Sequence, residues 1–304
     1  MRKNLMFYAL LLLFTIACTS TNSSDQQGKV RIVATTGIIG DALINLLDTN
    51  AEITSLMGPG VDPHLYKATQ GDLQRLNNAD IIVYNGLHLE GKMIEILERL
   101  KDKKTVFSME EMLDTDNFIQ AEGFSGNYDP HIWFDVELWS QAVNNLGSHL
   151  ADTLGFNKEI LANRDNYVLR LKNLHDSVKA AISSIPQKNR VLVTAHDAFE
   201  YFGRAYNIEV RGLQGISTLS EAGIKDITKL VNFLVENKIP AVFVETSVSR
   251  RSIDAVVEGC VRKGHPLKIG GYLYSDALGK AGSPEGTYIG TVRSNVKTIV
   301  EALK

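Results

Sequence analysis

The feature that most constrains the fold is a long helical stretch, residues 158–186, near the middle of the chain. Apolar side chains recur at helical spacing from Ile160 to Ile182, and Pro186 ends the pattern because proline cannot continue a helix. At about 1.5 Å per residue, such a helix is about 40 Å long, which exceeds the width of a small domain. The stretch therefore predicts one rigid linker helix that runs along two lobes.

Short apolar runs bounded by turn residues lie on both sides of this helix, with helical patterns between them. The expected strands are residues 31–34, 53–56, 81–84 and 105–108, then 191–194, 208–211, 242–245 and 267–270. This alternation is typical of parallel sheets covered by helices. We therefore expect an α/β fold with two lobes, residues 29–157 and 187–304, each a four-stranded parallel sheet flanked by helices.

The N-terminus has the pattern of an export signal. Arg2 and Lys3 precede an apolar run, residues 5–16, that is too short to span a bilayer but suits a signal peptide, here residues 1–17. Cys18 follows a small residue, as at a bacterial lipoprotein cleavage site, although Thr15 stands where that signal usually has leucine. The polar residues 18–28 then form a flexible tether. We expect an exported protein anchored through lipidated Cys18; cleavage with full release is the alternative.

Composition excludes several classes of partner and site. Thirty-two basic and 35 acidic residues give a formal charge of -3, which excludes the concentrated positive field of a nucleic-acid-binding protein. Apart from Cys18, the chain has one cysteine, Cys260, in an apolar helical pattern. A disulfide and a cysteine-rich metal site are thereby excluded, and Cys260 is interpreted as a core residue.

The tripeptide Asp-Pro-His occurs twice, as Asp62-Pro63-His64 and Asp129-Pro130-His131. Proline fixes its own backbone angle and restricts the residue before it, so each histidine stands on a stiffened loop. A single such histidine is usually a solvated turn residue, but the repetition favours metal ligands.

His196 and Asp276 complete a candidate set of four. Each follows a predicted strand at its carboxyl end, the edge where open α/β sheets bind ligands. Three imidazoles and one carboxylate suit Zn²⁺ and are acceptable to Mn²⁺. The alternative is that His196 or Asp276 caps a helix. Glu245, at a strand end, is a fallback ligand or an acceptor for a histidine N–H. The remaining histidines show no partner spacing and are not assigned to the site: His88, His149, His175 and His265.

Five ordered segments, spread from about residue 29 to the end of the chain, resemble the manganese- and zinc-binding solute receptors of bacterial ABC importers, cluster A-I or class III. They are residues 59–64, 129–133, 194–202, 215–223 and 275–279. The resemblance implies two lobes, a rigid linking helix, and one metal ion between the lobes on His64, His131, His196 and Asp276. It also implies delivery of the ion to a permease with a cytoplasmic ATPase, and we expect a monomer facing the periplasm or cell exterior.

The resemblance leaves the metal open. Some manganese-dedicated members have glutamate at the position of His196. Histidine at this position makes the site similar to the three-histidine members, which have been associated with both metals. Residues 114–128 contain no histidine, unlike the histidine-rich insertion of many zinc-dedicated members. This favours manganese, although the affinity order favours zinc.

Two other functions compete with metal capture. A metallohydrolase is disfavoured because four protein ligands leave no open position for water and the chain lacks His-Glu-x-x-His. The other alternative is an adhesin or a receptor for a larger solute such as a metal chelate; related folds that bind chelates use a broad aromatic or basic cleft instead of converging imidazoles.

Overall fold

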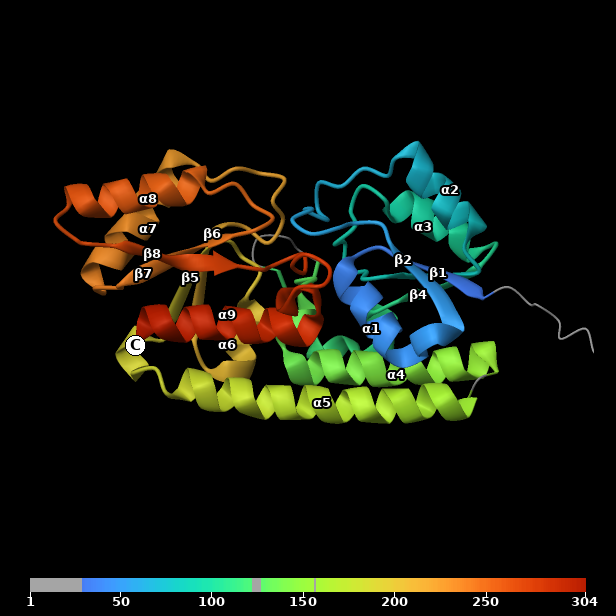
Figure 1. The fold of residues 1–304 in the computed structure, drawn as a ribbon. Helices are drawn as coiled ribbons and strands as arrows, with labels where there is room; N and C mark the ends of the chain where they lie inside the picture. The colour runs from blue at the N-terminus through green and yellow to red at the C-terminus, as the bar shows by residue number, and fades with distance from the viewer. Residues whose placement is uncertain (1–28, 122–126, 156) are drawn as a thin grey trace, which may run out of the picture.

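A computed structural model describes residues 29–121, 127–155 and 157–304; the predicted signal peptide, the tether and Cys18 lie outside them. Figure 1 shows two lobes side by side above one long helix. The first lobe consists of β1 (Val30–Ala34), α1 (Gly37–Leu47), β2 (Ala51–Ser55), α2 (Gln70–Asn78), β3 (Ile81–Tyr84), α3 (Ile94–Lys101), β4 (Thr105–Ser108) and α4 (Val136–Leu154). The linker is α5 (Asn157–Ser183). The second lobe consists of β5 (Val191–His196), α6 (Glu200–Tyr206), β6 (Glu209–Gln214), α7 (Ile224–Glu236), β7 (Ala241–Glu245), α8 (Arg251–Arg262), β8 (Lys268–Leu273) and α9 (Tyr288–Leu303). Short 3-10 turns are η1 (Asp48–Asn50), η2 (Glu110–Met112), η3 (Thr115–Asn117), η4 (Ile132–Phe134), η5 (Gln187–Asn189) and η6 (Pro284–Gly286).

The first lobe is built on a parallel sheet of order β2-β1-β3-β4. Its central strand β1 pairs with both neighbours, so that Ile32 lies opposite Ile53 on one side and Ile81 on the other. Helices cover both faces: Leu76 of α2 and Leu97 of α3 belong to one apolar cluster, and α1 and α4 contribute to another. Because both faces are buried, β3 is apolar along its whole length, as expected for a parallel sheet.

In the second lobe all four predicted strands are present, but their hydrogen bonds group them as two parallel pairs, β5-β6 and β7-β8. Strands β5 and β7 lie side by side. At their carboxyl ends a side chain connects them, because the Glu245 carboxylate accepts the backbone N–H of His196 at 2.9 Å. The β7-β8 register is also irregular between Val242 and Phe243. This lobe therefore departs from the continuous four-stranded sheet of the first.

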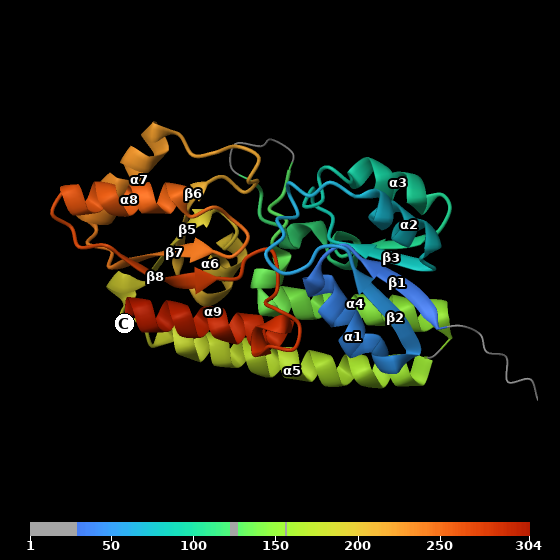
Figure 2. The ribbon, with the colours of Figure 1, turned by 45° about the horizontal axis from the view of Figure 1, so that its top comes forward.

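The linker helix α5 joins the lobes through packing along its whole length (Figures 1 and 2). It contacts α1 and α4 of the first lobe and α6 and α9 of the second. One apolar cluster contains side chains from both lobes and from α5, including Ile32, Leu171 and Ile299. The Tyr167 hydroxyl donates to Asp41 of α1 at 3.0 Å, and Asp41 also accepts the Tyr288 N–H of α9 at 3.2 Å. A shared core and these bonds make the connection rigid.

Two further predictions concern single features. Cys260 is fully buried in the apolar cluster of the second lobe, as expected of a core residue. Among the described residues, no helix combines the length and hydrophobicity needed to cross a bilayer.

Candidate metal centre

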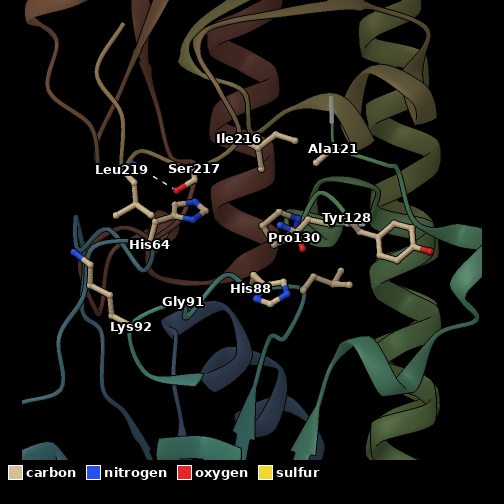
Figure 3. A pocket seen from close by; sticks show the side chains of 12 residues that line it. His64, His88, Gly91, Lys92, Ala121, Tyr128, Pro130, Ile216, Ser217 and Leu219 are labelled. Atoms are coloured by element: carbon tan, nitrogen blue, oxygen red, sulfur yellow. Dashed lines mark hydrogen bonds between the residues drawn. The ribbon is translucent and has the colours of Figure 1, made fainter. Parts of the chain in front are cut away.

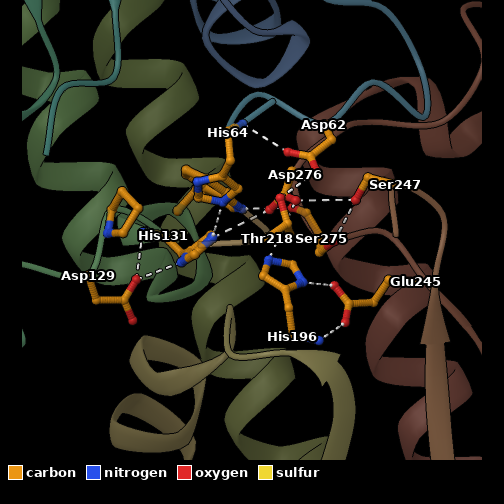
Figure 4. A network of polar contacts seen from close by, with 12 residues as sticks. Asp62, His64, Asp129, His131, His196, Thr218, Glu245, Ser247, Ser275 and Asp276 are labelled. Atoms are coloured by element: carbon orange, nitrogen blue, oxygen red, sulfur yellow. Dashed lines mark hydrogen bonds and ion pairs between the residues drawn. The ribbon is translucent and has the colours of Figure 1, made fainter. Parts of the chain in front are cut away.

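Four side chains from distant parts of the chain meet between the lobes (Figure 4). His64 lies on the loop from β2 to α2, His131 immediately before η4, His196 at the end of β5, and Asp276 on the loop after β8. One ligand atom from each lies within 4.8 Å of the others, and among the described residues this is the only such group of three or more. The structure thus brings together all four residues that the sequence singled out.

The ligand atoms face one another in a buried space. His64 Nε2 is 3.3 Å from His131 Nε2, and the Asp276 oxygens lie 3.5 Å from His131 Nε2 and from His196 Nε2. The exposed fractions are 4% for His64, 2% for Asp276 and 0% for the other two. Within the described chain, His196 Nε2 and Asp276 Oδ1 have no hydrogen-bond partner. Buried polar atoms normally have partners, so these unpaired atoms fit a bound cation.

Both Asp-Pro-His tripeptides make the same local turn. In each, Oδ1 of the aspartate accepts the backbone N–H of the histidine two residues later, at 2.8 Å for Asp62 and 2.9 Å for Asp129. This side-chain turn and the intervening proline restrict the backbone of His64 and His131. The two motifs differ beyond the turn: Asp62 also accepts the Thr218 hydroxyl of the second lobe at 2.6 Å, whereas Asp129 contacts the imidazole of His131.

A carboxylate contacts Nδ1 of two of the imidazoles. Asp129 Oδ1 lies 2.6 Å from Nδ1 of His131, and Glu245 Oε2 lies 2.5 Å from Nδ1 of His196. In both cases Nε2 faces the cluster, so a carboxylate on Nδ1 orients the ring with Nε2 available to a metal. Sequence reasoning did not assign this position to Asp129. The sequence feature that could have identified Asp129 is the aspartate two residues before the histidine in the repeated motif.

Neither Asp276 nor His196 caps the α-helix that follows it in the sequence. Thr287 is the N-cap of α9, and Phe199 is the N-cap of α6 without a side-chain cap bond. Asp276 Oδ2 accepts the Ser247 hydroxyl at 3.2 Å, and the neighbouring Ser275 carbonyl accepts the Trp133 indole N–H of the first half of the chain at 3.0 Å. Asp276 is therefore held at the junction of the lobes.

Burial and charge set different protonation states for the three imidazoles. Burial, opposed by the charge of Asp276 and assisted by the two neighbouring histidines, lowers the pKa of His64 to about 3. Burial also opposes the charged form of His131, but the carboxylates of Asp129 and Asp276 outweigh it and raise the pKa to about 9. Likewise Glu245 and Asp276 outweigh burial and raise the pKa of His196 well above its usual range. The pKa of Asp276 falls well below normal because the effect of His196 and His131 exceeds that of burial.

At neutral pH these shifts favour a neutral His64 beside protonated His131 and His196, with Asp276 ionised. A divalent ion would replace the two imidazolium protons, keep three neutral nitrogen donors and pair with the carboxylate. Such a donor set suits Zn²⁺ and is acceptable to Mn²⁺.

The other histidines lie outside the cluster. Of these, His88 lines a cavity of about 320 Å³ between the lobes, and His64 is the only one of the four clustered side chains on its wall (Figure 3). Leu87, Pro130 and Ile216 make much of the remaining wall apolar. This cavity is neither a broad aromatic cleft nor a basic one.

Comparison with known proteins gives consistent results. Residues 32–302 match the family described as ZnuA, zinc-uptake complex component A, periplasmic. The chain is 45% identical to the manganese-binding lipoprotein MntA of Bacillus subtilis over the whole of both chains. It is 44% identical to the zinc-binding protein TroA of Treponema pallidum, over 95% of this chain and 94% of that protein. A solved structure of periplasmic zinc-binding TroA from T. pallidum superposes with a TM-score of 0.88 at 45% identity, covering 91% of this chain and 99% of that one.

Proposed function

The chain belongs to the ZnuA family of periplasmic metal-uptake components, and from this premise we propose that it captures a single Mn²⁺ or Zn²⁺ ion on His64, His131, His196 and Asp276. The observation that carries the proposal is the convergence of four buried ligand atoms within 4.8 Å of one another. Membership also separates the chain from enzymes, since the family transports metal, and it places the protein outside the cytoplasm.

The burial of the four ligands favours a bare ion over a chelate. Their exposed fractions do not exceed 4%, so an organic ligand on the metal would have to displace protein side chains. The four side chains also supply at least four protein donors, whereas a hydrolytic metal keeps a position for water. Capture and release is the function that such a closed site supports.

Manganese is the cargo that we propose for the protein in its host. Both oxygens of Asp276 face histidine nitrogens at 3.5 Å, so the four side chains offer up to five donor atoms, and carboxylate oxygen suits Mn²⁺. The relatives divide, because MntA is named for manganese and TroA for zinc. Elemental analysis of protein purified from its native host without added metal tests this proposal; zinc at one equivalent would overturn it.

Glu245 acts through His196 rather than as a ligand in this proposal. Its two oxygens bind the backbone N–H and contact Nδ1 of the same residue, on the side of the ring away from Asp276. Loss of such a carboxylate partner typically weakens metal binding by about 10- to 100-fold. Glu245→Gln should therefore weaken binding within that range, while Glu245→Ala should weaken it more by also freeing the backbone N–H. Unchanged affinity in both variants would contradict the assignment.

Delivery and anchoring complete the proposal. The family supplies the substrate-binding component of metal ABC transporters, as the name of the FimA relative of Streptococcus parasanguinis states. We propose that the loaded protein, a monomer, docks on a permease coupled to a cytoplasmic ATPase, and that lipid on Cys18 holds it at the membrane. Mass spectrometry of the membrane fraction tests the anchor, because lipidation adds a defined mass to a chain that begins at Cys18.

Calorimetric titration of purified protein with Mn²⁺ and Zn²⁺ tests the ligand set. His64→Ala and Asp276→Ala should each abolish tight binding at one equivalent, whereas His149→Ala, an exposed histidine outside the cluster, should bind normally. Metal at 100 times Kd should raise the unfolding free energy of the unmodified chain by about 2.7 kcal/mol and leave the Asp276 variant unchanged. Normal affinity in both site variants would remove the assignment.

A further inference from the structure

Residues before and after His131 contact the second lobe, although they belong to the first half of the chain. The Arg204 guanidinium of α6 donates to the Asn117 carbonyl at 2.8 Å. Downstream, Phe134 packs on Phe199 with ring centroids 4.2 Å apart. Residues on both sides of His131 therefore contact α6 or its N-cap residue Phe199.

Tyr201 of α6 makes the central contact. Its hydroxyl donates to the Asp129 carbonyl at 2.9 Å and accepts the Ile119 N–H at 3.1 Å. The Asp129 N–H in turn donates to the Ile119 carbonyl at 2.8 Å. Tyr201 is fully buried, so water does not replace these bonds. One hydroxyl thus binds the backbone of both Ile119 and Asp129, which precede His131 in the sequence.

The side chain of Asp129 depends on this backbone restraint. Its Oδ1 holds both the backbone N–H and Nδ1 of His131, while Oδ2 is buried and has no hydrogen-bond partner among the described residues. Within the part of the chain that the structure describes, His131 is therefore the only residue whose hydrogen bonds fix the direction of this carboxylate. Its position follows from the Asp129 backbone, which Tyr201 and Ile119 hold.

The first lobe restrains the next residue. The Asn85 amide donates to the Pro130 carbonyl at 3.0 Å, and the Asn85 N–H donates to the buried Glu90 carboxylate at 2.8 Å. His131 consequently follows two consecutive carbonyls, one held by each lobe. A small shift of the Asp129 backbone would move the Asp129 carboxylate and, with it, the imidazole of His131.

We propose that Tyr201 is a positioning residue of the metal centre: from the second lobe, its hydroxyl fixes the Asp129 backbone and so orients the imidazole of His131 toward the ion. The inference rests on the proposed ligand role of His131. It assigns to α6 a part in metal affinity although Tyr201 does not touch the ion.

The test is Tyr201→Phe, which removes one oxygen and keeps the ring. Carboxylate partners of ligands contribute about 10- to 100-fold to metal affinity, and Tyr201 acts one step further out, so we expect about 10-fold weaker Mn²⁺ binding. The visible absorption spectrum of the Co²⁺-loaded variant should also shift, because a reoriented imidazole changes the ligand field. A purely structural role would leave that spectrum unchanged.

Tyr167→Phe is the matched control. Tyr167 is also buried, and its hydroxyl makes a hydrogen bond to another element, to Asp41 of α1, away from the metal centre. It should lower thermal stability to a similar extent without changing Mn²⁺ affinity or the Co²⁺ spectrum. Equal effects of the two variants on affinity, or an affinity of Tyr201→Phe within about twofold of the unmodified chain, would overturn the proposal.

Two further variants keep the result decisive. If Tyr201→Phe does not fold, exposed Arg204→Met removes both the bond to Asn117 and the guanidinium that lies 5.0 Å over the Tyr201 ring, which should loosen Tyr201 and weaken Mn²⁺ binding; unchanged Mn²⁺ affinity in that variant overturns the proposal. His131→Ala separates this inference from the ligand assignment. Normal affinity of His131→Ala would mean that the ligand set is wrong, whereas loss in His131→Ala with none in Tyr201→Phe would reject the positioning role alone.

Discussion

Metal binding should release about two protons at pH 7.5. The pKa of His131 is raised to about 9, so its imidazole is more than about 95% protonated at that pH, and the pKa of His196 is also raised well above the ordinary value. His64, with a pKa of about 3, is already neutral, and Asp276 is already ionised. The ion must displace one proton from each of the two charged rings.

The direction and size of the pH dependence follow from this count. The metal-free protein binds more protons than the loaded protein, so affinity increases with pH. Where both rings are protonated, as between pH 5.5 and 6.5, affinity should rise by about 100-fold per pH unit, equivalent to about 2.7 kcal/mol. The rise should slacken as the pH approaches the His131 pKa of about 9. Two histidines with the ordinary pKa of about 6.5 would together release only about 0.2 protons at pH 7.5.

Calorimetry in buffers of different ionisation enthalpy measures the proton count directly, as the slope of observed enthalpy against buffer enthalpy. His131→Gln should release about one proton fewer than the unmodified chain. His64→Gln should bind more weakly yet release the same number, because His64 carries no proton to lose at this pH. Release of less than about half a proton at pH 7.5 by the unmodified chain would refute the assignment of charge in the site.

Two predictions concern the scaffold. On the linker helix, Leu171→Ala should lower the free energy of unfolding by about 2–5 kcal/mol in urea titrations, because Leu171 is fully buried in the core shared by the lobes. Leu169→Ala, two residues earlier and 59% exposed, should change it by less than about 0.5 kcal/mol, and equal effects would contradict the shared core. Gly86→Ala should destabilise the chain by about 2 kcal/mol or more, since Gly86 has φ of 83° and an added Cβ would lie 2.5 Å from a Glu110 oxygen. A thermal unfolding midpoint equal to that of the unmodified chain would show that the loop relaxes freely.

Local patterns in the amino-acid sequence predicted the strands, the helices and the candidate ligands. Strands and helices have their own hydrophobic periods, so the two sets of strands and the long helix could be identified from local pattern alone. The ends of two elements differ from the predicted bounds: α5 ends at Ser183, before Pro186, and β5 continues through His196 instead of stopping at residue 194. His64 and His131 could be singled out as candidate ligands because Asp-Pro-His is a local structure, with the turn made inside the tripeptide.

Which groups support those candidate ligands depends on tertiary contacts. Glu245 lies 49 residues from His196, and Tyr201 lies 72 residues from Asp129, so neither contact leaves a periodic pattern in the sequence. The same holds for the grouping of the second-lobe strands into two pairs, because hydrophobic runs define strands but not their partners. Raised and lowered pKa values in the site likewise arise from burial and from charges brought close by folding. Local chemistry is encoded along the chain, whereas the orientation and protonation of the ligands depend on contacts that exist only once the lobes have packed together.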